Sequence, residues 1–95
     1  MILPTNRKPT HPGEMLHEEF IKPTGLNQKK LALHLGWTAA GLNEIIHGKR
    51  GITAESALAL ADAFEMEPEF WLNLQLAWDL WHANIRHVPK LKIAA

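Results

Sequence analysis

The sequence predicts an all-α domain of five helices, because its apolar residues recur at helical spacing and each stretch has its own start and stop residues. Its 95 residues correspond to one domain. With 46% hydrophobic and 21% charged residues, the composition is that of a folded globular protein and excludes a disordered chain.

Three absences narrow the class of protein. The chain has no cysteine, which excludes disulfides and thiolate metal sites. Its apolar runs are too short and too often interrupted to cross a membrane. Residues 1–9 lack the basic-then-apolar order of a signal peptide. We therefore expect a cytoplasmic protein with no membrane partner.

The chain divides into an arm and a domain. Residues 1–10 contain two prolines and no periodic pattern, so they are predicted to form an extended arm. Residues 11–95 are predicted to form the single domain. Within it, two stretches carry the functional predictions, residues 28–47 and residues 68–88.

The first helix is expected over residues 12–22, with a proline in its first turn, where the missing N–H costs nothing. Leu16 and Phe20 lie on one face of this helix. Pro23 and Gly25 follow directly and are expected to end it.

Residues 28–47 predict two short helices joined by a tight turn. Asn27 and Thr38 are the expected N-caps, and Gly36 lies at the turn, where glycine adopts a left-handed backbone most easily. Ala32 is small where the two helices must approach each other. The apolar residues expected to point into the shared interior are Leu31, Leu35, Trp37, Leu42 and Ile45. This is the helix-turn-helix arrangement, whose second helix enters the DNA major groove.

Side chains suited to DNA lie on and beside the second of these helices. Asn43 can make paired hydrogen bonds to adenine, and Thr38 can contact a base edge or a phosphate. Gln28 begins the first helix of the motif, where backbone N–H groups can hold a phosphate. The full set of candidate DNA-binding residues is Gln28, Thr38, Ala39, Ala40, Asn43, Lys49 and Arg50. The alternative is that Asn43 is an ordinary solvated residue and that the two cations only favour a helix C-terminus.

Charge is distributed unevenly, although the formal net charge is zero. Residues 27–50 carry four basic residues and one acidic residue, a local excess of +3. Residues 51–80 carry six acidic residues and no lysine or arginine, an excess of −6. The basic excess coincides with the helix-turn-helix, as expected for a protein that binds DNA phosphates there.

The fourth helix is expected over residues 54–64, with Thr53 as its N-cap. The residues expected to supply its core contacts are Ala57, Leu58, Ala61 and Phe64. The last helix is expected over residues 68–88, with Pro68 in its first turn.

This last helix is apolar on nearly every side, which indicates a second partner for it. Its residues at alternating steps of three and four predict a homodimer seam formed by Trp71, Leu74, Trp78, Trp81 and Ile85. A second stripe consists of Leu72, Leu76 and Leu80. The alternatives are a helix buried within its own domain, or a ligand pocket formed by the tryptophans.

Motifs for catalysis or metal binding are absent from the sequence. His17-Glu18-Glu19 begins like a zinc-protease motif but lacks its second histidine. Glu18 and Glu19 are adjacent, so they point to different helix faces and cannot flank one substrate. We therefore expect no enzyme, no catalytic residue, no metal site and no cofactor.

Three segments of the chain resemble the HigA-type antitoxins of the Cro/CI-like helix-turn-helix superfamily. They are His11-Pro12-Gly13-Glu14-Met15-Leu16 with Glu18-Glu19-Phe20-Ile21-Lys22-Pro23, then Asn43-Glu44-Ile45-Ile46-His47-Gly48-Lys49-Arg50-Gly51-Ile52-Thr53, and Pro68-Glu69-Phe70-Trp71-Leu72-Asn73-Leu74-Gln75. The resemblance implies a Cro/CI repressor-like fold, with the DNA-reading helix over residues 38–47. One departure is Ala40-Gly41, where the family often has a serine or an arginine pair, and Gly41 weakens the helix by about 1 kcal/mol relative to alanine.

The resemblance implies an antitoxin of a type II toxin–antitoxin module. Such a protein neutralises a HigB-type, mRNA-cleaving toxin and represses its own operon by binding a palindromic double-stranded operator as a homodimer. Two alternatives remain: a stand-alone or phage-type repressor without a toxin, and a protein-interaction module with a vestigial helix-turn-helix. A neighbouring gene for a small basic protein would distinguish the antitoxin from the stand-alone repressor.

Overall fold

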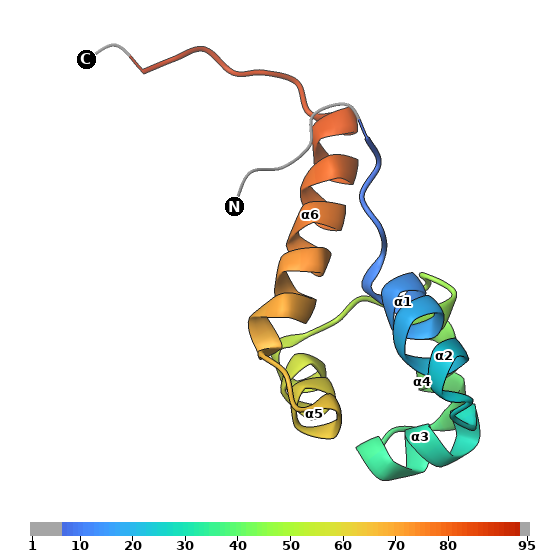
Figure 1. The fold of residues 1–95 in the computed structure, drawn as a ribbon. Helices are drawn as coiled ribbons and strands as arrows, with labels where there is room; N and C mark the ends of the chain where they lie inside the picture. Colours follow the sequence, from blue (N-terminus) through green and yellow to red (C-terminus); the bar gives the residue numbers. More distant parts are fainter. Residues whose placement is uncertain (1–6, 94–95) are drawn as a thin grey trace.

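The computed structural model describes residues 7–93, which form helices and no strand (Figure 1). The first helical rod consists of α1 (Pro12–Met15), the π-helical segment η1 (Leu16–Ile21) and α2 (Lys22–Thr24). The helix-turn-helix follows as α3 (Gln28–Leu35) and α4 (Ala39–Ile46). Then come α5 (Ala54–Phe64) and α6 (Pro68–Arg86). The prediction of an all-α fold is confirmed. Residues 1–6 of the predicted arm lie outside the described residues.

The first rod begins with a side-chain cap and ends later than expected. The backbone N–H of Gly13 donates to Nδ1 of His11, which is the N-cap, at 2.9 Å. Pro23 does not end the rod, because it lies inside α2 directly after the π-helical segment. A π turn relaxes the clash that a proline ring makes with the preceding turn of an α-helix. Gly25 then ends the rod with a left-handed backbone, φ 68°.

The rod lies directly against the backbone of α4 at Gly13. A Cβ atom added at Gly13 would lie only 1.6 Å from the carbonyl oxygen of Ile45. Glycine is therefore required here by the close approach of two backbones, and this contact fixes where α4 lies relative to α1.

The predicted caps of the helix-turn-helix are confirmed. The Asn27 side chain accepts a hydrogen bond from the N–H of Lys30, and the Thr38 hydroxyl accepts one from the N–H of Gly41. Gly36 adopts a left-handed backbone at the turn, φ 76°. Of the five expected interior residues, three are buried and two, Leu35 and Trp37, pack partly buried against the core.

One of the core residues predicted for α5 is wrong. Thr53 caps this helix in a reciprocal box with Ser56, and Ala57 and Ala61 are buried as expected. Leu58 is 55% exposed, however, and Leu60 is fully buried in its place. The helical period explains the difference, because Leu60 shares a face with Ala57 and Ala61, whereas Leu58 lies to one side.

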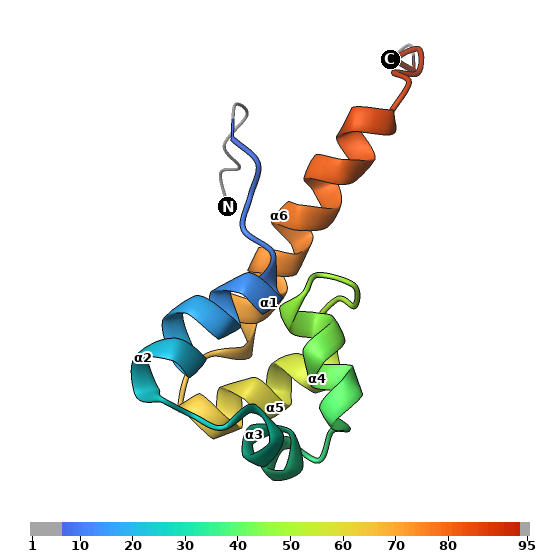
Figure 2. The ribbon, with the colours of Figure 1, turned by 90° about the vertical axis from the view of Figure 1, so that its right-hand side faces the viewer.

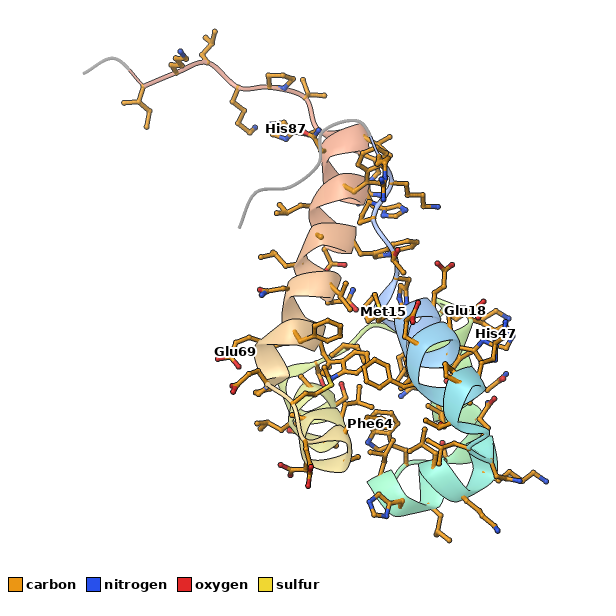
Figure 3. The ribbon with its side chains drawn as sticks, in the orientation of Figure 1. Met15, Glu18, His47, Phe64, Glu69 and His87 are labelled. Carbon is orange, nitrogen blue, oxygen red and sulfur yellow. The ribbon has the colours of Figure 1, made fainter. Side chains whose placement is uncertain are left out.

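The core lies where α5 and the start of α6 meet the first rod. Phe20 from η1 packs against Phe64 from α5 and Trp71 from α6, with ring centroids 5.0 and 5.2 Å apart. Figure 3 shows Phe64 between α5 and the first rod. Trp71 has no exposed surface, so its predicted place in a dimer seam is wrong: it is a core residue of its own chain.

The second half of α6 extends beyond the other helices, with residues 7–11 beside the helix (Figure 2). The helix ends at Arg86, one turn or less before the predicted end at Val88. Among the described residues, no helix combines the length and apolar character needed to cross a bilayer.

Candidate nucleic-acid interface

The N-terminal part of α4 presents its predicted DNA-binding residues to solvent. Thr38, Ala39, Ala40 and Asn43 are exposed, whereas Gly41, Leu42 and Ile45 on the same helix are buried. The buried residues hold α4 against the domain, so the helix can enter a groove without unfolding. The exposed face is small and carries few polar groups, because two of its members are alanines.

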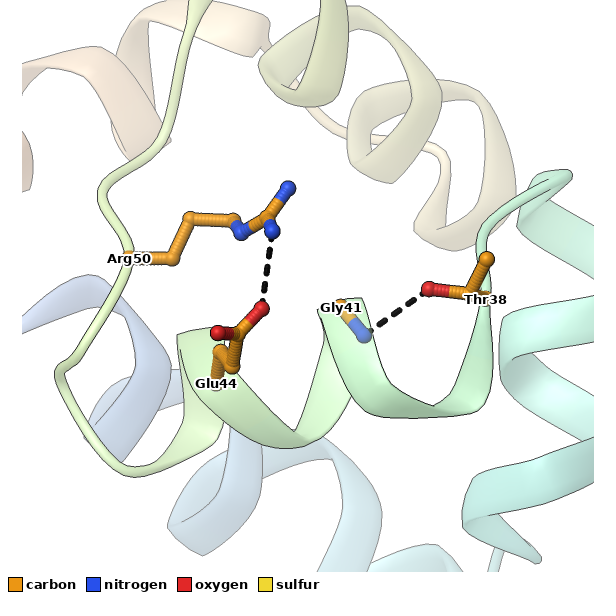
Figure 4. A network of polar contacts seen from close by, with 4 residues as sticks. All are labelled: Thr38, Gly41, Glu44 and Arg50. Atoms are coloured by element: carbon orange, nitrogen blue, oxygen red, sulfur yellow. Dashed lines mark hydrogen bonds and ion pairs between the residues drawn. The ribbon is translucent and has the colours of Figure 1, made fainter.

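Thr38 has a structural role in addition to its predicted one. Its Oγ1 accepts the hydrogen bond from the N–H of Gly41 at 2.9 Å (Figure 4). A Cβ at residue 41 would lie 3.0 Å from that oxygen. The glycine thus leaves room for the cap, which offsets part of its low helix propensity. The hydroxyl hydrogen of Thr38 is still available to donate.

Gln28 and Asn43 are brought together by the crossing of α3 and α4. The Nε2 group of Gln28 donates to Oδ1 of Asn43 at 3.3 Å. Asn43 keeps its own NH₂ group free of this bond, so it can donate to a base edge. Sequence reasoning named both residues separately and did not predict their contact, because they lie 15 positions apart.

The basic loop after α4 is held by the backbone of Glu44. Its carbonyl oxygen accepts hydrogen bonds from the N–H groups of Lys49 and Arg50, at 2.8 and 3.2 Å. Gly48 precedes them with a left-handed backbone, φ 73°. Both cationic side chains are exposed, as a phosphate contact requires.

Gln75 fastens the far side of this loop to α6, and sequence reasoning missed it. Its Oε1 accepts a hydrogen bond from the N–H of Ile52 at 2.7 Å, and its Nε2 donates to Asp79 at 2.9 Å. A Cβ added at Gly51 would lie 3.0 Å from the Gln75 side chain. The sequence shows only a glutamine between Leu74 and Leu76, which does not identify Ile52 as its partner.

The N-terminal segment covers part of the surface of α6 that was predicted to form a dimer seam. The ring of His11 packs edge-on against Trp78, with centroids 4.9 Å apart, and the amine of Lys8 lies 5.0 Å from the centre of the Trp78 ring. The ring of His82 also packs against Trp78, tilted by 40° and with centroids 4.3 Å apart. Trp78 is therefore half-buried by its own chain.

The other residues of the predicted seam are only partly covered by their own chain. Leu74 packs partly buried against the core, and Trp81 is half-buried. Ile85 is 69% exposed, and the second stripe is exposed at Leu76 and Leu80. The apolar surface that a partner can cover thus lies on the second half of α6.

A cavity of about 570 Å³ lies between residues 8–11 and the helix-turn-helix. Its lining includes His11, His17, Gln28, His47 and Trp78. His11 is buried, and this burial lowers its pKa below the ordinary value, although Asp79 and Glu14 act in the opposite direction. In the described part of the chain, no group of three or more His, Asp or Glu side chains could hold a metal ion.

The helices α3 and α4, joined at the Gly36 turn and with one face of α4 exposed, define a helix-turn-helix protein. The family described as helix-turn-helix matches residues 18–71. Antitoxin HigA-1 of Vibrio cholerae is 41% identical over 88 residues, covering 93% of this chain and 83% of that protein. Virulence-associated protein I of Dichelobacter nodosus is 47% identical over 70 residues, covering 74% of this chain and 65% of its own length.

Solved structures give the same result. Antitoxin GraA has a TM-score of 0.82 at 40% identity, covering 90% of this chain and 99% of that one. GraA in complex with its operator has a TM-score of 0.79 at 38% identity, covering 97% of this chain and all of that one (100%). The chain belongs to the helix-turn-helix family and, within it, to the HigA-type antitoxins.

Proposed function

We propose that this protein represses its own operon by binding a palindromic operator, and that it neutralises a HigB-type toxin. The observation that carries the DNA-binding part is the exposed polar pair of Gln28 and Asn43, flanked by the basic loop. The similar antitoxin GraA is recorded in complex with its operator, which supports this assignment.

Within the proposal, the interface residues fall into two groups. Asn43 and Thr38 contact base edges, and the methyl groups of Ala39 and Ala40 contact thymine methyls. Gln28, Lys49 and Arg50 contact phosphates and fix the register of the helix on the duplex. Because the base-reading face is small, shape readout of the operator contributes to specificity.

The operator-bound form is a homodimer in this proposal. The exposed Ile85 and the half-buried Trp81, which lie on one face of the second half of α6, supply the interface. A two-fold axis there would place two copies of α4 about 34 Å apart, one turn of DNA.

The operator assignment is tested by comparing the affinity of the protein for its promoter and for a random duplex. Equal affinity for the two would contradict the operator assignment.

The toxin partner is proposed from the family, since the similar proteins are named antitoxins. We expect the chain to act in the cytoplasm, where its operator and toxin would be found, and to have no enzymatic activity of its own. Expression of the neighbouring gene with and without this chain tests the assignment. Toxicity relieved by this chain supports it, and no growth effect favours the stand-alone repressor.

A further inference from the structure

The guanidinium of Arg50 is already occupied in the free protein. Its Nη2 atom lies 2.7 Å from Oε1 of Glu44, which is in α4 (Figure 4). The two side chains are 59% and 45% exposed, so solvent reaches the pair and it can open. A negative charge thus lies on α4 itself and neutralises a cation of the basic loop.

We propose that Glu44 determines specificity by holding Arg50 away from DNA phosphates until the operator is bound. This inference rests on the proposed DNA-binding function. Binding to random DNA depends almost entirely on phosphate contacts, so a cation that must first leave a carboxylate of its own protein contributes less to it. On the operator, the base contacts of α4 bring the backbone close, and a phosphate takes the place of the carboxylate beside Arg50.

The loop backbone does not depend on the Glu44 carboxylate, which makes the two roles of this residue separable. The carbonyl oxygen of Glu44 holds the N–H groups of Lys49 and Arg50, and Gln75 holds Ile52. These bonds persist in Glu44→Gln, which removes only the negative charge. A neighbouring cavity of about 410 Å³, lined by Arg50 and the caps Thr38 and Thr53, gives the released guanidinium room to move.

The test compares the wild type and Glu44→Gln on a labelled promoter duplex and on a scrambled duplex, by fluorescence anisotropy between roughly 50 and 200 mM salt. We expect Glu44→Gln to bind scrambled DNA about fivefold to tenfold tighter at 0.1 M salt, the gain from one added phosphate contact. The slope of log affinity against log salt on scrambled DNA should steepen by about 0.9. Promoter affinity should change less than about twofold, so the preference for the promoter falls.

Two controls separate this role from a general change of charge. Glu69→Gln removes the same charge at the start of α6, which Figure 3 shows on the opposite side of the molecule from His47. It should leave both affinities near the wild-type values. In an Arg50→Ala background, Glu44→Gln should have no further effect on scrambled DNA, because the released group is missing.

The outcomes distinguish the inference from the proposed function. If the wild type prefers its promoter but Glu44→Gln behaves as Glu69→Gln does, the inference is wrong and the proposed function stands. The inference is also wrong if Glu44→Gln acts equally in the Arg50→Ala background. If the wild type shows no preference for its promoter, both are overturned.

Discussion

Gln28 and Asn43 are joined by a hydrogen bond from Nε2 to Oδ1, 3.3 Å long, across the crossing of α3 and α4. The bond uses Oδ1 of Asn43 and leaves the exposed NH₂ group of this residue available to donate. We expect Asn43→Ala to reduce the preference for promoter over scrambled DNA by about tenfold, the value of one paired base contact. Competition binding measures the ratio, and an unchanged ratio would remove Asn43 from base reading.

Lys49 should act on all DNA sequences alike, because its exposed amine follows α4 and is suited to a phosphate. Lys49→Ala should weaken binding to promoter and scrambled duplexes by a similar factor and reduce the salt slope by about 1. Titrations over a range of salt concentrations check this. A loss confined to the promoter would mean that Lys49 reads bases instead.

Stability should depend on pH through His11. Burial lowers the pKa of His11, opposed by Asp79 and Glu14 and assisted by His82. Because the pKa is lower in the folded state, the contribution of His11 to stability is complete above its unfolded pKa of about 6.5 and falls as the pH drops below that value. Protonation at Nδ1 also removes the acceptor that caps α1.

The matched variant is His11→Asn, which keeps a capping acceptor but does not titrate. The free energy of unfolding should fall more for the wild type than for His11→Asn between about pH 7.5 and pH 5.5. Urea unfolding at several pH values measures both. Parallel pH profiles would show that His11 is not the titrating group.

Gly13→Ala should strongly destabilise the fold, because its Cβ would lie 1.6 Å from the backbone oxygen of Ile45. We expect a loss of about 3 kcal/mol or more in the free energy of unfolding. Gly25→Ala is the control: residue 25 has open space, so only its left-handed backbone opposes the change, at about 1 kcal/mol. Equal losses in the two variants would contradict the close approach of α1 and α4.

The homodimer is tested best at Ile85, which is 69% exposed and contributes little to its own domain. Ile85→Glu should shift the protein to monomers in sedimentation equilibrium, because the partner would bury the charge. Trp78→Glu is less informative, since Trp78 also packs against Lys8 and His11. Leu58→Glu on α5 is the control, and an unchanged dimer in Ile85→Glu would place the interface elsewhere.

Local signals predicted most of the fold, because caps and turns act within a few residues. Asn27, Thr38 and Thr53 each bond to a backbone N–H three residues away, and Gly25 and Gly36 adopt the left-handed backbone at their helix ends. Such caps and turns are determined by residues that are close together in the sequence.

The errors arose where distant segments meet. A tryptophan in an apolar stripe is compatible with a core or with a dimer, and the packing of distant residues such as Phe20 makes Trp71 a core residue. The bond between Gln75 and Ile52 joins residues 23 positions apart, and no local pattern encodes it. The π-helical segment before Pro23 also depends on how the whole rod packs.

The most direct test of the central claim is a nuclease footprint of this protein on the promoter of its own gene. We predict one protected site with two-fold symmetry and half-sites about one helical turn apart, formed by the wild type at a concentration where Asn43→Ala gives none. Uniform protection along the fragment, or no protection at any concentration, would contradict the assignment of this helix-turn-helix as an operator reader.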